Sequence, residues 1–140
     1  MASNWSKVPV KLRRLKELAL FALAAEACAD ETQFSVALVG DEEMSRLNMK
    51  FRTKEGPTDV LSFAMADELD PEFLGEVVIS PAQAALHAAE EGITLGAEMD
   101  ALLVHGILHL VGYEHGSPDS ESVMFARQEE LLRSFAGRGR

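Results

Sequence analysis

Three of the four histidines in the sequence, His105, His109 and His115, stand within eleven residues. His105 and His109 are four residues apart, so on a helix both imidazoles project from one face, one turn apart. Gly112 lets the chain reverse after that helix, which can return His115 to the same point in space. Three neutral imidazoles that meet in this way form a tridentate zinc site with a fourth position open to water. The spacing therefore predicts one zinc ion per chain.

The same His-x-x-x-His-x-x-Gly-x-x-His spacing occurs in zincin-like metzincin proteases, but one residue of their motif is missing. Those enzymes place a glutamate directly after the first histidine as general base, and this chain has Gly106 there. Loss of a general base costs about 10²–10⁴-fold in rate. A metzincin-like metalloprotease is therefore a minor alternative. No other carboxylate base follows from the spacing, and Glu114 and Glu76 are the two candidates.

The elements that must position these histidines alternate between strand and helix. Residues 34–39, 58–63 and 74–80 have the composition and alternation of strands, and the last two should form a hairpin with an acidic connector. No repeat and no linker divides the chain. We therefore expect one domain over residues 1–140, of the α+β class, in which helices pack on a small mixed β-sheet and one of them is a zincin-like metal helix.

The predicted helices have clear start or stop residues. Apolar residues at helical spacing indicate an amphipathic first helix from Leu12 to Leu23. Asp41 is expected to cap the second helix, a capping box at 80–83 to start the third, and Thr94 to cap the fourth. Gly92 and Gly112 are the expected stops of the third and fourth helices. The last helix should begin at Ser117-Pro118 and run through Met124, Phe125, Leu131 and Leu132. The helix after Thr94 is apolar nearly all round and should lie in the core. His87, in the helix before it, has the features of a partly exposed structural histidine.

Charge is spread unevenly along the chain, whose formal net charge is −10. Residues 55–126 contain no Lys or Arg and fourteen acidic residues, whereas residues 1–54 carry a small positive excess. An acidic surface disfavours nonspecific binding to polyanions, so no DNA partner is expected. The apolar run at 18–25 is too short to span a membrane. We expect a cytoplasmic protein without a membrane partner.

Residues 105–115 (His-Gly-Ile-Leu-His-Leu-Val-Gly-Tyr-Glu-His) closely resemble the signature of the YbeY family, bacterial endoribonucleases of rRNA maturation. Two further blocks agree in order and spacing, one with Leu47-Asn48, Phe51-Arg52 and residues 57–63, and one at residues 74–80. The chain departs from the family pattern at Glu114 and Glu76, where Asp is usual, and at Ala64, where proline is usual. Residues 1–11 contain no convincing strand, which leaves open whether the family's first edge strand is replaced.

The resemblance implies that Arg52 faces the metal site and takes part in catalysis. Cleavage of a phosphodiester builds negative charge on phosphoryl oxygens, and a guanidinium can clamp two of them. The function implied is a single-strand-specific, metal-dependent endoribonuclease in late-stage ribosome quality control and maturation of the 3′ end of 16S rRNA. The implied partners are single-stranded RNA or rRNA, and small ribosomal subunit proteins or an assembly GTPase. Basic residues for an RNA track are Lys50 and Lys54, together with those between Lys7 and Lys16.

One alternative of a different class remains. A zinc-stabilised ribosome assembly factor without catalytic activity would have the same histidines, but a closed metal site with a fourth protein ligand. The acidic balance and the missing base favour it modestly.

Overall fold

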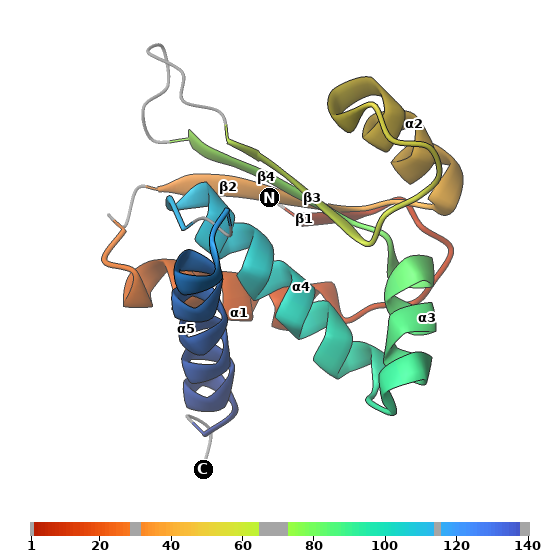
Figure 1. The fold of residues 1–140 in the computed structure, drawn as a ribbon. Helices are drawn as coiled ribbons and strands as arrows, with labels where there is room; N and C mark the ends of the chain where they lie inside the picture. The colour runs from red at the N-terminus through yellow and green to blue at the C-terminus, as the bar shows by residue number, and fades with distance from the viewer. Residues whose placement is uncertain (1, 29–31, 65–72, 114–115, 138–140) are drawn as a thin grey trace.

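The computed structural model describes residues 2–28, 32–64, 73–113 and 116–137, in which a mixed sheet is packed with helices (Figure 1). The strands are β1 (Ala2–Asn4), β2 (Gln33–Leu38), β3 (Val60–Ala64) and β4 (Phe73–Ile79), in the order β1-β2-β4-β3. β2 pairs in parallel with both β1 and β4, and β3 pairs antiparallel with β4. The predicted α+β class and the β3–β4 pairing are confirmed. The acidic connector at 65–72 lies outside the described residues.

The first edge strand is present, although the composition of residues 1–11 does not indicate one. Ala2 lies opposite Val36 and Asn4 opposite Leu38, and the backbone N–H of Trp5 extends the pairing by donating to the carbonyl of Leu38 at 2.6 Å. Ala, Ser and Asn have little intrinsic preference for strands. Pairing with an already ordered neighbour overrides that weak preference, as is usual for β-structure.

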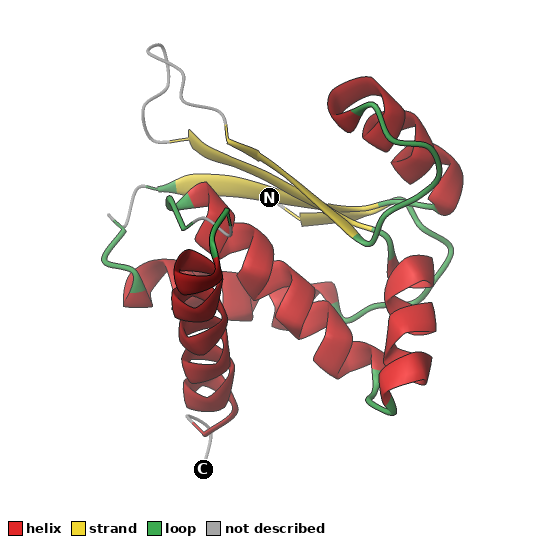
Figure 2. Ribbon diagram, in the orientation of Figure 1, coloured by secondary structure: helices red, strands yellow, loops and turns green. Residues whose placement is uncertain are grey.

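Helices cover the two faces of the sheet unequally (Figure 2). α1 (Leu12–Ala25), α4 (Leu95–Leu110) and α5 (Pro118–Gly137) form the larger core with one face, and α2 (Asp41–Arg52) packs on the other. The smaller cluster under α2 consists of Val39, Met44, Leu61 and Val78. Nine residues of α4 are buried, which confirms that this apolar helix lies in the core.

The predicted caps Ser80 and Thr94 form, but the capping box at 80–83 is incomplete, because Ser80 N donates to the Asp59 carbonyl instead of to Gln83, and the predicted Asp41 cap does not form. The hydroxyl oxygens of Ser80 and Thr94 accept hydrogen bonds from the backbone at the starts of α3 (Pro81–Glu91) and α4, at 3.3 and 3.1 Å. The N-cap of α2, however, is Gly40, and Asp41 is its first helical residue. The Asp41 carboxylate instead accepts hydrogen bonds from Ser80 Oγ at 2.9 Å and Gln83 Nε2 at 3.2 Å. Gln83 is therefore drawn to Asp41, and this contact joins the starts of α2 and α3.

The last predicted helix forms as α5, which begins at Pro118 and includes Met124, Phe125, Leu131 and Leu132. Met124 and Leu131 are buried, but Phe125 is 60% exposed because it lies on the outer side of that helix. Within the described residues no single helix has both the length and the apolar character to cross a membrane. α3 and α4 would meet that test only as a pair, and they are bent by 115° where they join.

Candidate active site

The structure brings His105 and His109 together on α4. Their rings pack edge to face with centroids 4.7 Å apart, and their Nε2 atoms are 3.2 Å apart. Both side chains are half-buried. The third predicted ligand, His115, and the base candidate Glu114 lie outside the described residues. The helical spacing of four thus produces the convergence that the sequence predicts for the first two ligands.

A buried amide on α5 forms a hydrogen bond with His105. The Gln128 side-chain oxygen lies 3.2 Å from His105 Nδ1. An amide oxygen only accepts hydrogen bonds, so Nδ1 carries a proton, and in the neutral ring the lone pair is on Nε2, on the side of His109. Hydrogen bonds of this kind orient metal-binding histidines in proteins.

Gln128 was not among the predicted site residues, although the sequence contains a signal for it. The buried residues of α5 are Met124, Gln128, Leu131 and Phe135, which recur at helical spacing. Gln128 is the polar residue in that stripe, and it is only 9% exposed. A buried polar side chain needs a partner, and here the partner is His105.

The geometry of the histidine pair fits a shared zinc ion. Two nitrogens about 2.0–2.1 Å from one tetrahedral ion lie about 3.3–3.4 Å apart, close to the 3.2 Å between the two Nε2 atoms. In the neutral ring, a proton on Nδ1 leaves Nε2 free to bind a metal, and neutral imidazole is the metal-binding form. The donor set and its spacing therefore suit the ion that the sequence predicts.

Close packing explains why the residue after His105 is glycine. A Cβ atom at Gly106 would lie 2.7 Å from Val77 Cγ1 on β4 and 3.0 Å from Ser62 Oγ on β3. Any side chain there would collide with the sheet. A glutamate at this position could not serve as a base here, because the position faces the sheet.

Arg52 shares a cleft of about 470 Å³ with both histidines. It is the last residue of α2, and its side chain is exposed. Thr53 ends the helix in the left-handed conformation, with φ +52°. The cleft is lined by Phe51, Arg52, Val60, Leu61, Ser62, Phe63, His105 and His109. The structure thus places a guanidinium-bearing helix end, the edge strand β3 and the two imidazoles around one space.

Aromatic rings form part of the wall of this cleft. The Phe51 ring packs edge to face on Phe63 at 5.0 Å, and Lys50 Nζ lies 5.2 Å from the centre of the Phe51 ring. Phe51 remains 55% exposed. An exposed ring beside a cation is a surface on which a nucleobase can stack.

The base candidate Glu76 lies in a different cavity. Successive side chains of a strand point to opposite faces of the sheet, and Val77 of β4 contacts α4 at Gly106. Glu76 therefore points to the other face, where it lines a cavity with Trp5 and Glu43. The structure does not bring Glu76 together with the histidine pair.

The basic residues proposed as an RNA track lie on two sides of the sheet. α2, with Lys50 and Arg52, packs on one face and α1 on the other (Figure 1). On α1, Arg14 Nη1 donates to both carboxylate oxygens of the buried Asp100, at 2.6 and 2.7 Å. This hydrogen bond raises the pKa of Arg14. The charge of Arg14 is thus used within the fold, and Lys50, Arg52 and Lys54 are the basic residues nearest the cleft.

The sequence is similar to curated proteins named Endoribonuclease YbeY. The relative from Thermobifida fusca is 43% identical over an alignment that covers 95% of this chain and 91% of that protein. The relative from Mycolicibacterium gilvum is 40% identical over 95% of this chain and 80% of that protein. The relative from Bacillus licheniformis is 37% identical over 89% of this chain and 85% of that protein.

A solved structure and a family model also match nearly the whole chain. The solution structure of a Thermotoga maritima protein matches with a TM-score of 0.67 and 30% identity, over 94% of this chain and 87% of that one. The family model described as Endoribonuclease YbeY matches residues 2–136. This match spans α2 with Arg52 and α4 with both histidines. The chain therefore belongs to the YbeY family of endoribonucleases.

Proposed function

We propose that this chain is a zinc-dependent endoribonuclease that cleaves single-stranded RNA in the cleft between Arg52 and the histidine pair. Zinc would be held by His105, His109 and His115. The observation that supports the proposal best is the shared cleft, where the end of α2 and the C-terminal part of α4 face the same space. Residues 1–140 would act as one domain.

The residues at the cleft would have separate roles in phosphodiester cleavage. When bound, zinc acts as a Lewis acid toward phosphoryl oxygens and activates water near neutral pH. Arg52 would clamp the phosphoryl oxygens as negative charge builds on them. Gln128 keeps His105 in its metal-binding tautomer. Phe51 would stack a base next to the scissile phosphate and so hold the strand in register.

The cellular role that we propose is maturation of the 3′ end of 16S rRNA and late-stage ribosome quality control, in the cytoplasm. Two features of the chain support a need for docking partners. The cleft has few basic residues beside it, and residues 55–126 contain no Lys or Arg. Weak affinity for free RNA would then be supplemented by contacts with small ribosomal subunit proteins or an assembly GTPase.

One observation favours the alternative, a zinc-stabilised assembly factor without catalytic activity. The residues that line the cleft in the described part of the chain include no carboxylate, and Glu76 lies on the other face of the sheet. Such a protein would bind the ribosome with the same surface but would not cleave RNA.

Measuring metal content and RNA cleavage on one pure sample tests both functions. Arg52→Ala should lower the cleavage rate about 10²–10³-fold, as for loss of one preorganised donor in a transition state. Arg133→Ala is the matched control, because Arg133 is exposed on α5 and does not line the cleft. The control should cleave at the rate of the unmodified chain.

The two functions differ in their outcomes. An endoribonuclease loses cleavage with Arg52→Ala while its zinc content stays constant. If the zinc-loaded chain does not cleave RNA, the catalytic proposal is wrong. If Arg52→Ala cleaves at full rate, the proposed role of Arg52 is wrong. Zinc binding without cleavage is the result expected of the assembly factor.

A further inference from the structure

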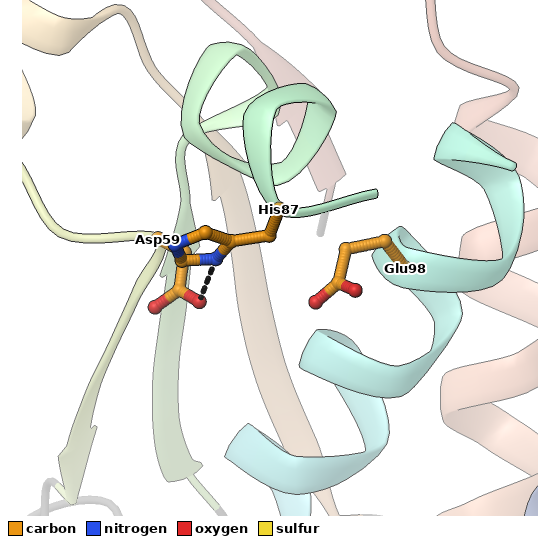
Figure 3. Close-up of side chains that lie close together, drawn as sticks. All are labelled: Asp59, His87 and Glu98. Atoms are coloured by element: carbon orange, nitrogen blue, oxygen red, sulfur yellow. Dashed lines mark hydrogen bonds and ion pairs between the residues drawn. The ribbon is translucent and has the colours of Figure 1, made fainter. Parts of the chain in front are cut away.

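A second group of metal-binding side chains lies at the other end of α4. Asp59 precedes β3, His87 is on α3, and Glu98 is in the first turn of α4. One ligand atom from each residue lies within 4.8 Å of one atom from each of the others. Figure 3 shows that the three side chains come from three separate elements and point toward one another. All three are half-buried.

Two of the ligand atoms lie close to the separation that a shared ion requires, in a direct polar contact that the ion would replace. His87 Nδ1 lies 3.0 Å from Asp59 Oδ2, and ligands of one tetrahedral zinc ion are about 3.3 Å apart. Glu98 is the most distant member. Its side chain is long and half-exposed, so a change of rotamer can bring its carboxylate closer without moving the backbone.

The backbone holds this arrangement in place. The carbonyl of Asp59 accepts a hydrogen bond from Ser80 N at 2.9 Å, which anchors the start of β3 to the end of β4. Gly92, at φ +70°, and the Thr94 cap set the turn between α3 and α4. His87 and Glu98 therefore face each other across a turn that the sequence defines on both sides.

The charges around the group favour a cation. Burial raises the pKa of Glu98, the negative charges of Glu91 and Asp59 raise it further, and His87 lowers it. No Lys or Arg occurs anywhere between residues 55 and 126. Arg14 of α1 reaches α4, but its guanidinium is paired with Asp100. A divalent ion would offset the repulsion between the carboxylates.

We propose that Asp59, His87 and Glu98 form a second metal site that binds a divalent transition metal. One imidazole with two carboxylates is a ligand set suited to zinc and similar ions, and three protein ligands leave positions for water. Glu98 and His105 are seven residues apart, so the two sites are separated by about 10 Å along α4. This distance exceeds the roughly 3.5–4 Å of a two-metal catalytic centre. The second ion would join β3, α3 and α4 and would neutralise part of the acidic surface.

The test counts the metal ions bound by the 140-residue chain. The chain is stripped with a chelator, titrated with Zn²⁺ alone and followed by calorimetry, with native mass spectrometry for stoichiometry. The unmodified chain should bind two ions. His87→Gln should bind one, and Glu98→Gln should bind the second ion about tenfold or more weakly. Glu90→Gln, a carboxylate on α3 outside the group, is the control and should bind two.

A second readout separates metal binding from the structural role of the His87–Asp59 contact. Addition of Zn²⁺ should raise the unfolding temperature of His109→Ala, in which the second site is intact. The combined variant His87→Gln, His109→Ala should show no such rise. If Zn²⁺ binds His87→Gln and Glu98→Gln with the stoichiometry and affinity of the unmodified chain, there is no metal site here.

Discussion

The two ends of α4 assemble their proposed metal ligands in different ways. At the C-terminal end, His105 and His109 come from one helix, one turn apart, and their Nε2 atoms are 3.2 Å apart. At the N-terminal end, Glu98 meets Asp59 and His87, which belong to two other elements. Ligands that share a helix are placed by helical geometry alone. Ligands from separate elements converge only once the fold is complete.

Support by neighbouring residues also distinguishes the two ends. A buried amide on α5 fixes the tautomer of His105. At the other end, the side chain nearest to the His87 ring is Asp59, itself one of the three proposed ligands. We therefore expect the C-terminal site to bind zinc more tightly than the N-terminal group, because preorganised ligands need less ordering on binding.

Loss of the hydrogen bond between Gln128 and His105 should produce the largest change that is confined to one end of α4. Gln128→Leu keeps the size of the side chain but removes the hydrogen-bond acceptor. Zinc affinity at the His105 end should fall about 10–100-fold, the usual effect of losing such a partner, while binding at the Asp59 end should not change. Calorimetric titration with Zn²⁺ measures both. Gln33→Leu, at an exposed position of β2, is the control, and equal affinities for the two variants would show that Gln128 does not support the site.

Two glycines of α4 allow a comparison of helix packing at the same two ends. Gly106→Ala should destabilise the fold by about 1–3 kcal/mol, because its Cβ would lie 2.7 Å from Val77 Cγ1. Gly96→Ala should stabilise it by up to about 1 kcal/mol, because alanine favours helix and the new Cβ would meet only Thr94 Oγ1, at 3.9 Å. Urea unfolding gives both values. An unchanged or raised stability of Gly106→Ala would show that Gly106 is not held against the sheet.

These comparisons show which parts of the site could be read from the sequence. The His105–His109 pair was predictable because both ligands and their spacing lie within one apolar helix. The caps at Ser80 and Thr94 were predictable for the same local reason. The position of Arg52 in the cleft followed from the family resemblance, not from its own surroundings in the sequence.

The remaining features depend on contacts between distant segments. β1 consists of residues with little strand preference and forms by pairing with β2. Asp41 does not cap α2, because it binds Ser80 and Gln83, about forty residues away. The sequence predicts that His87 is a structural histidine. It does not indicate the contact with Asp59, because the two residues are 28 positions apart in the chain. Sequence spacing does not record such contacts.

An aromatic substitution tests which cavity beside His105 receives RNA. Phe51 lies in the cleft with Arg52, and Phe125 lines a separate cavity of about 420 Å³ between α4 and α5 that also includes His105. Their exposures are similar, 55% and 60%. Phe51→Ala should weaken binding of a single-stranded oligonucleotide by about 1 kcal/mol through loss of stacking, and Phe125→Ala should not, as measured by fluorescence anisotropy. The reverse result would place the RNA between α4 and α5.

The smallest expected effect is the dependence of RNA binding on salt. Each phosphate contact to a single strand contributes about −0.7 to the slope of log affinity against log salt concentration, so four contacts give about −3. Few contacts are expected, because Lys50, Arg52 and Lys54 are the basic residues nearest the cleft, and Arg14 is engaged with Asp100 on the other side of the sheet. A slope steeper than about −6 would require the basic residues on both sides of the sheet to bind RNA. Tight, salt-insensitive binding to free RNA would contradict the need for a ribosomal docking partner, because the cleft alone would then supply the affinity.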